Sequence, residues 1–118
     1  MQRADVYECC FDPVEGTEQA GTRPAVVVSH TDLNTSLRRA IVAPITTFRG
    51  KRLFASQVLV RAPEGGLSRD SVVLCEQLRV LDEARLLRRR GSMTRQTMSA
   101  VDGALAATLG LRLRRSGD

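Results

Sequence analysis

The sequence predicts an α+β fold in which short strands form a compact β-barrel that a single C-terminal helix closes. Three observations predict this fold. Several β-rich segments of about four to eight residues follow one another, separated by turns that contain Gly and Pro. Only the last segment has apolar residues at helical spacing. The chain has 118 residues, so we expect one domain over residues 1–118.

The predicted strands are rich in β-branched and apolar residues. They span residues 4–11, 23–30, 39–46, 56–61 and 71–78. The second is typical of a buried strand because residues 25–28 are apolar without a break. Pro24 has no N–H, so it belongs at the start of that strand.

The segments between the strands have the composition of loops. Residues 12–22 contain Pro, two Gly and three acidic residues, which predicts a surface loop. Residues 31–37 predict a polar connection. Residues 47–55 predict a basic loop, and residues 62–66 a turn.

The C-terminal third is ambiguous at first and then clear. Residues 79–92 fit a short helical turn near residues 81–84 and a short strand near residues 87–90. A helix follows, with Thr94 as its N-cap and Gly110 as its C-cap. Its apolar stripe consists of Met98, Val101, Leu105 and Leu109.

The charge of the chain favours an acidic or polyanionic partner. Eighteen Lys and Arg stand against thirteen Asp and Glu, which gives a net charge of +5. The basic residues form three groups, at residues 38–52, 85–90 and 112–115. Each group could also be an ordinary solvated surface. Aromatic residues make up only 3% of the chain, so base-stacking platforms are poorly supported.

Other features of the sequence exclude several classes of protein. No apolar stretch approaches the roughly 20 residues that span a membrane, and the N-terminal residues have no apolar signal core. We therefore expect a cytoplasmic protein that does not bind membranes. Cys9, Cys10 and Cys75 have no metal-ligand spacing, so they are interpreted as reduced core residues. No metal site and no cofactor are expected.

Blocks of residues along most of the chain resemble, in order, the signature of MazF/PemK toxins. They are residues 12–13 (DP), 16–21 (GTEQAG), 23–29 (RPAVVVS), 43–47 (APITT), 66–79 (GLSRDSVVLCEQLR) and 98–105 (MSAVDGAL). The resemblance implies an SH3-like barrel of the MazF/CcdB toxin type and a homodimer. It also implies sequence-selective, metal-independent cleavage of single-stranded mRNA, and a cognate MazE-like antitoxin that covers the site.

The resemblance assigns a catalytic role to three residues. Arg23 and Thr46 match the family's catalytic pair, and Glu18 matches a glutamate that the family needs for function. An Arg fork suits the crowded, negatively charged phosphorane of RNA cleavage, and Glu18 could accept the 2′-OH proton. Other interpretations are a salt bridge at a strand start for Arg23, a β-forming residue for Thr46 and a solvated loop acid for Glu18.

A second set of residues is expected to bind RNA. Polar side chains near the motif can read base edges, and nearby cations can hold phosphates. The set consists of Thr17, Gln19, His30, Thr47, Arg49, Lys51, Arg52 and Gln77. Histidine is a common acid–base residue, but the family does not require a histidine at position 30, and His30 can equally be a strand-end residue in a groove wall.

Two other functions stay open at this point. CcdB-like relatives share the barrel and act by binding DNA gyrase, without chemistry of their own. An RNA-binding barrel without activity is the third possibility. The combination of Arg23, Thr46 and Glu18 favours the endoribonuclease.

Overall fold

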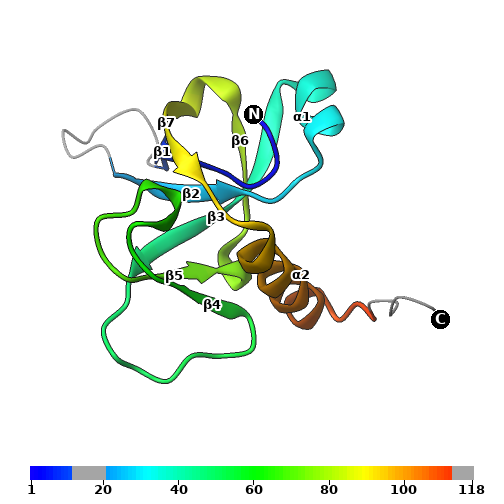
Figure 1. Cartoon of the computed structure of the whole chain (residues 1–118). Coiled ribbons are helices and arrows are strands. Elements are labelled where there is room, and N and C mark those ends of the chain that lie inside the picture. Colours follow the sequence, from blue (N-terminus) through cyan, green and yellow to red (C-terminus); the bar gives the residue numbers. More distant parts are fainter. Residues whose placement is uncertain (12–20, 113–118) are drawn as a thin grey trace.

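The computed structural model describes residues 1–11 and 21–112 (Figure 1). The strands are β1 (Asp5–Cys10), β2 (Thr22–Val27), β3 (Arg39–Thr47), β4 (Gln57–Val60), β5 (Ser71–Leu74), β6 (Arg79–Asp82) and β7 (Leu86–Ser92). The helices are α1 (Thr31–Leu37) and α2 (Arg95–Leu109), and 3-10 turns cover Glu64–Gly66, Cys75–Gln77 and Glu83–Arg85.

All described strands belong to one antiparallel sheet. Its order is β4-β5-β3-β2-β1-β7, and β6 pairs with β3 next to β5. The long strand β3 lies at the centre: its first half pairs with β6, its second half with β5, and β2 lies along its other edge. The described strands β4 and β7 do not pair, so the sheet curls without closing a ring of hydrogen bonds. The predicted strand-rich fold with one C-terminal helix is confirmed.

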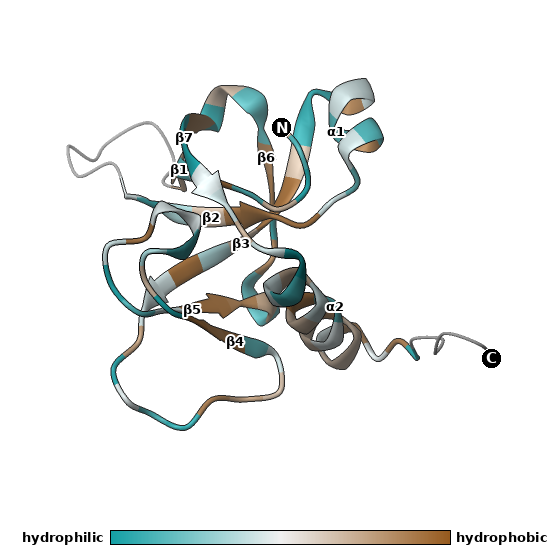
Figure 2. Cartoon of the chain, viewed as in Figure 1, coloured by the Kyte–Doolittle hydropathy of each residue, from teal (hydrophilic) through white to brown (hydrophobic). Residues whose placement is uncertain are grey.

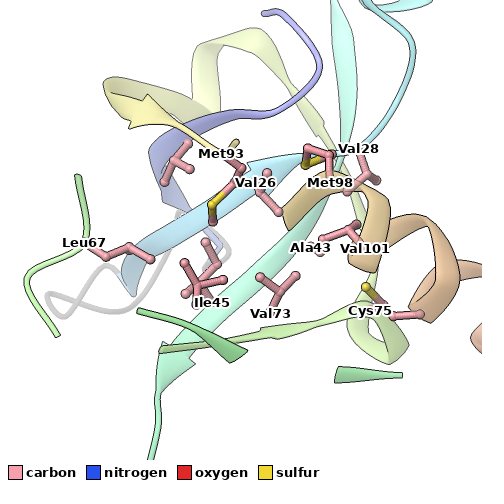
Figure 3. Packing of buried hydrophobic residues seen from close by; sticks show 13 residues of the cluster. Val26, Val28, Ala43, Ile45, Leu67, Val73, Cys75, Met93, Met98 and Val101 are labelled. Carbon is pink, nitrogen blue, oxygen red and sulfur yellow. The ribbon is translucent and has the colours of Figure 1, made fainter. Parts of the chain in front are cut away.

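The hydrophobic core lies on both faces of β2. Val26 belongs to the cluster beneath α2, together with Val73 and Val101 (Figure 3). Its neighbours Ala25 and Val27 face a second cluster on the other side. Both faces of the strand are buried, and this explains why its sequence is continuously apolar rather than alternating (Figure 2).

Helix α2 has the predicted caps. The Thr94 side chain accepts a hydrogen bond from the Thr97 N–H, and Gly110 ends the helix in the left-handed conformation. Met98 and Val101 are buried as predicted. Leu109 is 56% exposed, so the predicted apolar stripe is wrong at its last residue. In Figure 1 the C-terminal end of α2 extends past the sheet, where no strand covers it.

Three local predictions were wrong. Residues 31–37 form helix α1 rather than an irregular connection, because His30 Nδ1 caps the helix by accepting from the Asp32 N–H at 3.1 Å. The strand predicted at residues 71–78 ends at Leu74 in a 3-10 turn. The helical turn predicted at residues 81–84 begins later, after residues 79–82 have paired with β3 as β6.

The cysteines behave as core residues. None of the three forms a disulfide, and Cys9 and Cys75 are fully buried. Burial raises the pKa of Cys9 to about 12 and the pKa of Cys75 to about 11, so both thiols stay protonated at neutral pH. In the described part of the chain, no helix is long and apolar enough to cross a membrane.

Candidate active site

Neighbouring strands bring Arg23 and Thr46 to the same place. Strands β2 and β3 pair through Val27 with Val42, Val26 with Ala43 and Ala25 with Pro44. The same register, continued by two residues, sets Arg23 opposite Thr46. Both side chains line one pocket of about 340 Å³. The lining residues come from the start of β2 and the end of β3. These two strand ends lie on the left in Figure 1.

The lining of this pocket, which we call the Arg23 pocket, is basic and rich in hydroxyl groups. It consists of Arg23, Pro24, Ile45, Thr46, Thr47, Leu67, Ser68, Arg69, Ser71 and Arg90. The lining therefore includes three arginines and four residues with a hydroxyl group, and no Asp or Glu among the described residues. Such a lining suits an anion.

One of the three guanidinium groups already has partners. Arg90 donates to Glu8 Oε1 at 3.1 Å and to the Gly66 carbonyl oxygen at 2.9 Å. Arg23 and Arg69 form no ion pair with any residue that the structure describes. Arg90 thus fixes the wall of the pocket, whereas Arg23 and Arg69 keep their donors for a ligand.

The loop between β4 and β5 supplies the far wall of the pocket. Asp70 closes the loop by accepting from the Ala62 N–H at 2.9 Å and from Arg61 Nη1 at 3.0 Å. These two hydrogen bonds lower the pKa of Asp70 below its usual value. Glu64 accepts from the Thr94 N–H at 2.8 Å and so ties the loop to the start of α2. The wall is therefore held from several sides before any ligand binds.

Two further hollows adjoin the Arg23 pocket. Arg23 also lines a space of about 420 Å³ that contains Gln77. On the other side, Thr46 and Thr47 are shared with a space of about 270 Å³. That space contains the predicted phosphate-binding residues Arg49, Lys51 and Arg52. Most of the predicted site residues that the structure describes therefore line a row of neighbouring hollows that share lining residues.

His30 is the predicted residue that the structure keeps apart from this row. It lies beyond the opposite end of β2 from Arg23 and caps α1 with its imidazole. An extended strand of seven residues separates two positions by about 23 Å. His30 lines none of the three hollows. The predictions for Thr17, Glu18 and Gln19 fall outside the residues that the structure describes.

Reasoning from the sequence missed Arg69, Arg90 and Ser68 as site residues. Arg69 and Ser68 belong to a motif block, and Arg90 to a basic group, so signals existed in the sequence. Neither signal indicates which of several neighbouring arginines faces the pocket, because that depends on how β7 and the 61–70 loop pack.

The described part of the pocket can bind a phosphate and stabilise added negative charge. Guanidinium and hydroxyl groups donate hydrogen bonds to such an anion, and Arg23 and Arg69 have no carboxylate partner within the described residues that would compete for their donors. Its described lining holds no carboxylate or imidazole that could accept a proton. Within residues 1–11 and 21–112, no group of three or more His, Cys, Asp or Glu side chains gathers as metal ligands.

Comparison with known proteins identifies the family. Residues 2–109 match the model of the PemK-like, MazF-like toxins of type II toxin–antitoxin systems. The chain belongs to this toxin family. The similarity to MazF/PemK toxins seen in the sequence is thereby confirmed.

Individual relatives agree with this assignment. The chain is 36% identical to "Endoribonuclease MazF" of Staphylococcus saprophyticus, over 98% of this chain and 97% of the relative. It is 37% identical to the protein of the same name from Staphylococcus epidermidis, over 94% and 92%. These relatives of the MazF-like family support an RNA-cleaving toxin and give no support to the CcdB-like alternative.

Solved structures of MazF-like toxins have the same fold. MazF from Deinococcus radiodurans superimposes with a TM-score of 0.75 at 26% identity, over 94% of this chain and 97% of that chain. An endoribonuclease from a mycobacterial species, solved in complex with its cognate antitoxin, gives a TM-score of 0.78 at 24% identity, over 97% and 99%. The curled sheet with a C-terminal helix is therefore the MazF-type fold.

Proposed function

We propose that this MazF-like chain is a toxin that cleaves single-stranded mRNA without a metal ion, with Arg23 and Thr46 at the scissile phosphate. The observation that carries the proposal is that β2 and β3 bring these two motif residues into one basic pocket. The names of the staphylococcal relatives support the endoribonuclease activity.

The proposed reaction uses the RNA's own 2′-OH as the nucleophile. Its oxygen attacks the adjacent phosphorus, and the bond to the 5′-oxygen of the next nucleotide breaks. The 2′-OH proton passes to a base, for which we propose Glu18, and the leaving oxygen takes up a proton. Arg23 and the Thr46 hydroxyl donate hydrogen bonds to the phosphorane oxygens. The products are a 2′,3′-cyclic phosphate and a 5′-hydroxyl.

The neighbouring hollows supply the proposed RNA contacts. Gln77 faces the same space as Arg23 and can hydrogen-bond the edge of an unpaired base. Arg49, Lys51 and Arg52 are proposed to hold phosphates beyond Thr47. Thr17 and Gln19 stay proposals from the motif alone, as does a role for His30 in base preference.

Incubation of the purified protein with a long RNA in EDTA tests this function. We expect discrete fragments that end in a 2′,3′-cyclic phosphate or a 3′-phosphate, with a 5′-hydroxyl on the other side. A strict requirement for magnesium would contradict the proposal.

Thr46→Val keeps the shape of the side chain but removes its hydroxyl. Cleavage should therefore slow about tenfold or more while the protein stays folded.

We also propose that a MazE-like antitoxin covers the basic pocket and that the chain acts in the cytoplasm as a homodimer. The family name places such toxins in type II toxin–antitoxin systems, and the net charge of +5 favours an acidic partner. Adding the antitoxin should stop RNA cleavage, and the antitoxin and RNA should compete for the toxin.

Light scattering tests the homodimer and should give twice the chain mass of 12.9 kDa. A fully active monomer would argue against the dimer.

A further inference from the structure

The loop between β3 and β4 displays an aromatic side chain to solvent. The chain has three Phe, one Tyr and no Trp. Phe11 is buried and Phe48 half-buried, but Phe54 is 73% exposed. An aromatic ring left in water keeps an apolar surface that gains stability when something covers it. In the described part of the chain, Phe54 is the most exposed of the large hydrophobic residues.

Phe54 lies beside the candidate active site. It lines the hollow of about 270 Å³ that shares Thr46 and Thr47 with the Arg23 pocket. The two hollows are therefore neighbours, with the two threonines in the wall of both. We call this second space the Phe54 pocket.

The lining of the Phe54 pocket combines an apolar floor with cations. The apolar residues that line it include Leu53, Val72 and Leu74. Arg49, Lys51 and Arg52 also line it, and none of these three forms an ion pair within the described residues. The basic loop predicted at residues 47–55 is thus also an aromatic one.

Hydrogen bonds at both ends hold the loop that carries Phe54. The Phe54 N–H donates to Gln57 Oε1 at 3.2 Å, and the Gln57 N–H donates back to the Phe54 carbonyl at 3.0 Å. Glu76 then accepts from Gln57 Nε2 at 2.9 Å and from Ser56 Oγ at 2.8 Å. At the other end, the Phe48 N–H donates to the Asp70 carbonyl at 2.9 Å. These hydrogen bonds therefore hold both ends of the loop that carries the Phe54 ring.

The anchor at Glu76 is ionised at neutral pH. Burial raises the pKa of Glu76, but the hydrogen bonds from Gln57 and Ser56 outweigh it, so the pKa lies below its usual value. The charged form that holds Gln57 and Ser56 is therefore present above the normal pKa of a glutamate and is lost only as the pH falls through the depressed value.

We propose that Phe54 stacks on an unpaired base of the RNA substrate, next to the nucleotide whose phosphate occupies the Arg23 pocket. A ring beside three free cations matches a base flanked by two phosphates, and single-stranded nucleic acids are bound in this way. An acidic protein partner could also use a ring and cations, but the hollow that contains Phe54 shares Thr46 and Thr47 with the pocket proposed to hold the RNA phosphate, and this favours the RNA. The proposal rests on the proposed RNA cleavage and names a further contact of the same substrate.

Tryptophan fluorescence tests the stacking directly. Because the chain has no Trp, Phe54→Trp gives a single reporter in the pocket. The probe is a single-stranded oligoribonucleotide of mixed sequence with 2′-O-methyl groups, which block cleavage. We expect it to quench the fluorescence. An oligomer of the same length that consists of abasic sites keeps the phosphates and should leave the fluorescence nearly unchanged.

A matched control shows whether the quenching is local. Leu109→Trp places the reporter on α2, at a residue that is 56% exposed and lines none of the hollows around the site. Its fluorescence should not respond to the oligonucleotide. Equal quenching in both variants, or quenching of Phe54→Trp by the abasic oligomer, would overturn the proposal.

Cleavage kinetics separate this proposal from the proposed function. Loss of one base–aromatic stack weakens binding by about 5- to 150-fold. Phe54→Ala should therefore raise KM for RNA by a factor in this range and change kcat little, and Phe54→Tyr should restore KM. If the wild type cleaves RNA and Phe54→Ala does so with unchanged KM, the stacking proposal is wrong while the proposed RNA cleavage stands. If Phe54→Ala instead changes the mass of the assembly measured by light scattering, or the affinity for the antitoxin, while KM stays unchanged, Phe54 belongs to a protein interface.

Discussion

Replacing Arg23 by alanine is expected to lower the rate of RNA cleavage about a hundred- to a thousandfold. Arg23 lines the pocket opposite Thr46 and has no carboxylate partner within the described residues. Its donors are thus free for the charge that develops on the phosphorane. RNA binding should weaken less, since Arg69 and the loop cations remain. Single-turnover cleavage at saturating RNA measures the effect.

Two variants serve as controls for Arg23→Ala. Arg23→Lys keeps the charge but loses the two-pronged geometry of the guanidinium, so its rate should stay well below that of the wild type. His30→Asn changes a residue that caps α1 outside the pocket, and Asn is itself a good N-cap. Its fold and cleavage rate should be nearly unchanged. A dead His30→Asn beside an active Arg23→Ala would replace the assignment by a histidine mechanism.

Replacing Gly66 by alanine is expected to destabilise the fold by about 2–5 kcal/mol. Gly66 has a φ of +72°, and a Cβ built on it would overlap the backbone carbonyl of Arg90. The 61–70 loop and β7 would have to separate. Because Arg90 also donates to the Gly66 carbonyl, and Ser68 and Arg69 follow in the same loop, the wall of the Arg23 pocket would move too. Denaturant unfolding measures the loss of stability.

Gly50→Ala is the matched control for this prediction. Gly50 has a similar φ of +79°, but nothing lies within 4 Å of a Cβ at that position. Only the backbone cost of a left-handed conformation applies, about 1 kcal/mol. Equal stability losses in the two variants would show that the close approach of Gly66 to Arg90 contributes nothing.

The strands could be predicted from the sequence where one local rule decides them. The unbroken apolar run at residues 25–28 predicted a buried strand, and β2 is buried, on both of its faces. The caps of α2 were equally local, because Thr94 and Gly110 act through the residues beside them. Helix α1 was missed because its polar sequence resembles a loop. The buried Asn34 holds it, with hydrogen bonds to the carbonyls of Ser29 and Met1.

The sequence by itself determined the family, the candidate pair Arg23 and Thr46, and the basic character of the molecule, because motif order and charge do not depend on packing. Only the tertiary structure decided that the two side chains share a pocket. Their proximity follows from the register of β2 on β3, which a local pattern does not encode. The tertiary structure likewise decided that His30 lies at the other end of β2, that Arg90 lines the Arg23 pocket, and that Phe54 lines the neighbouring hollow. These positions depend on contacts between residues far apart in the sequence, and such contacts form only when the whole sheet does.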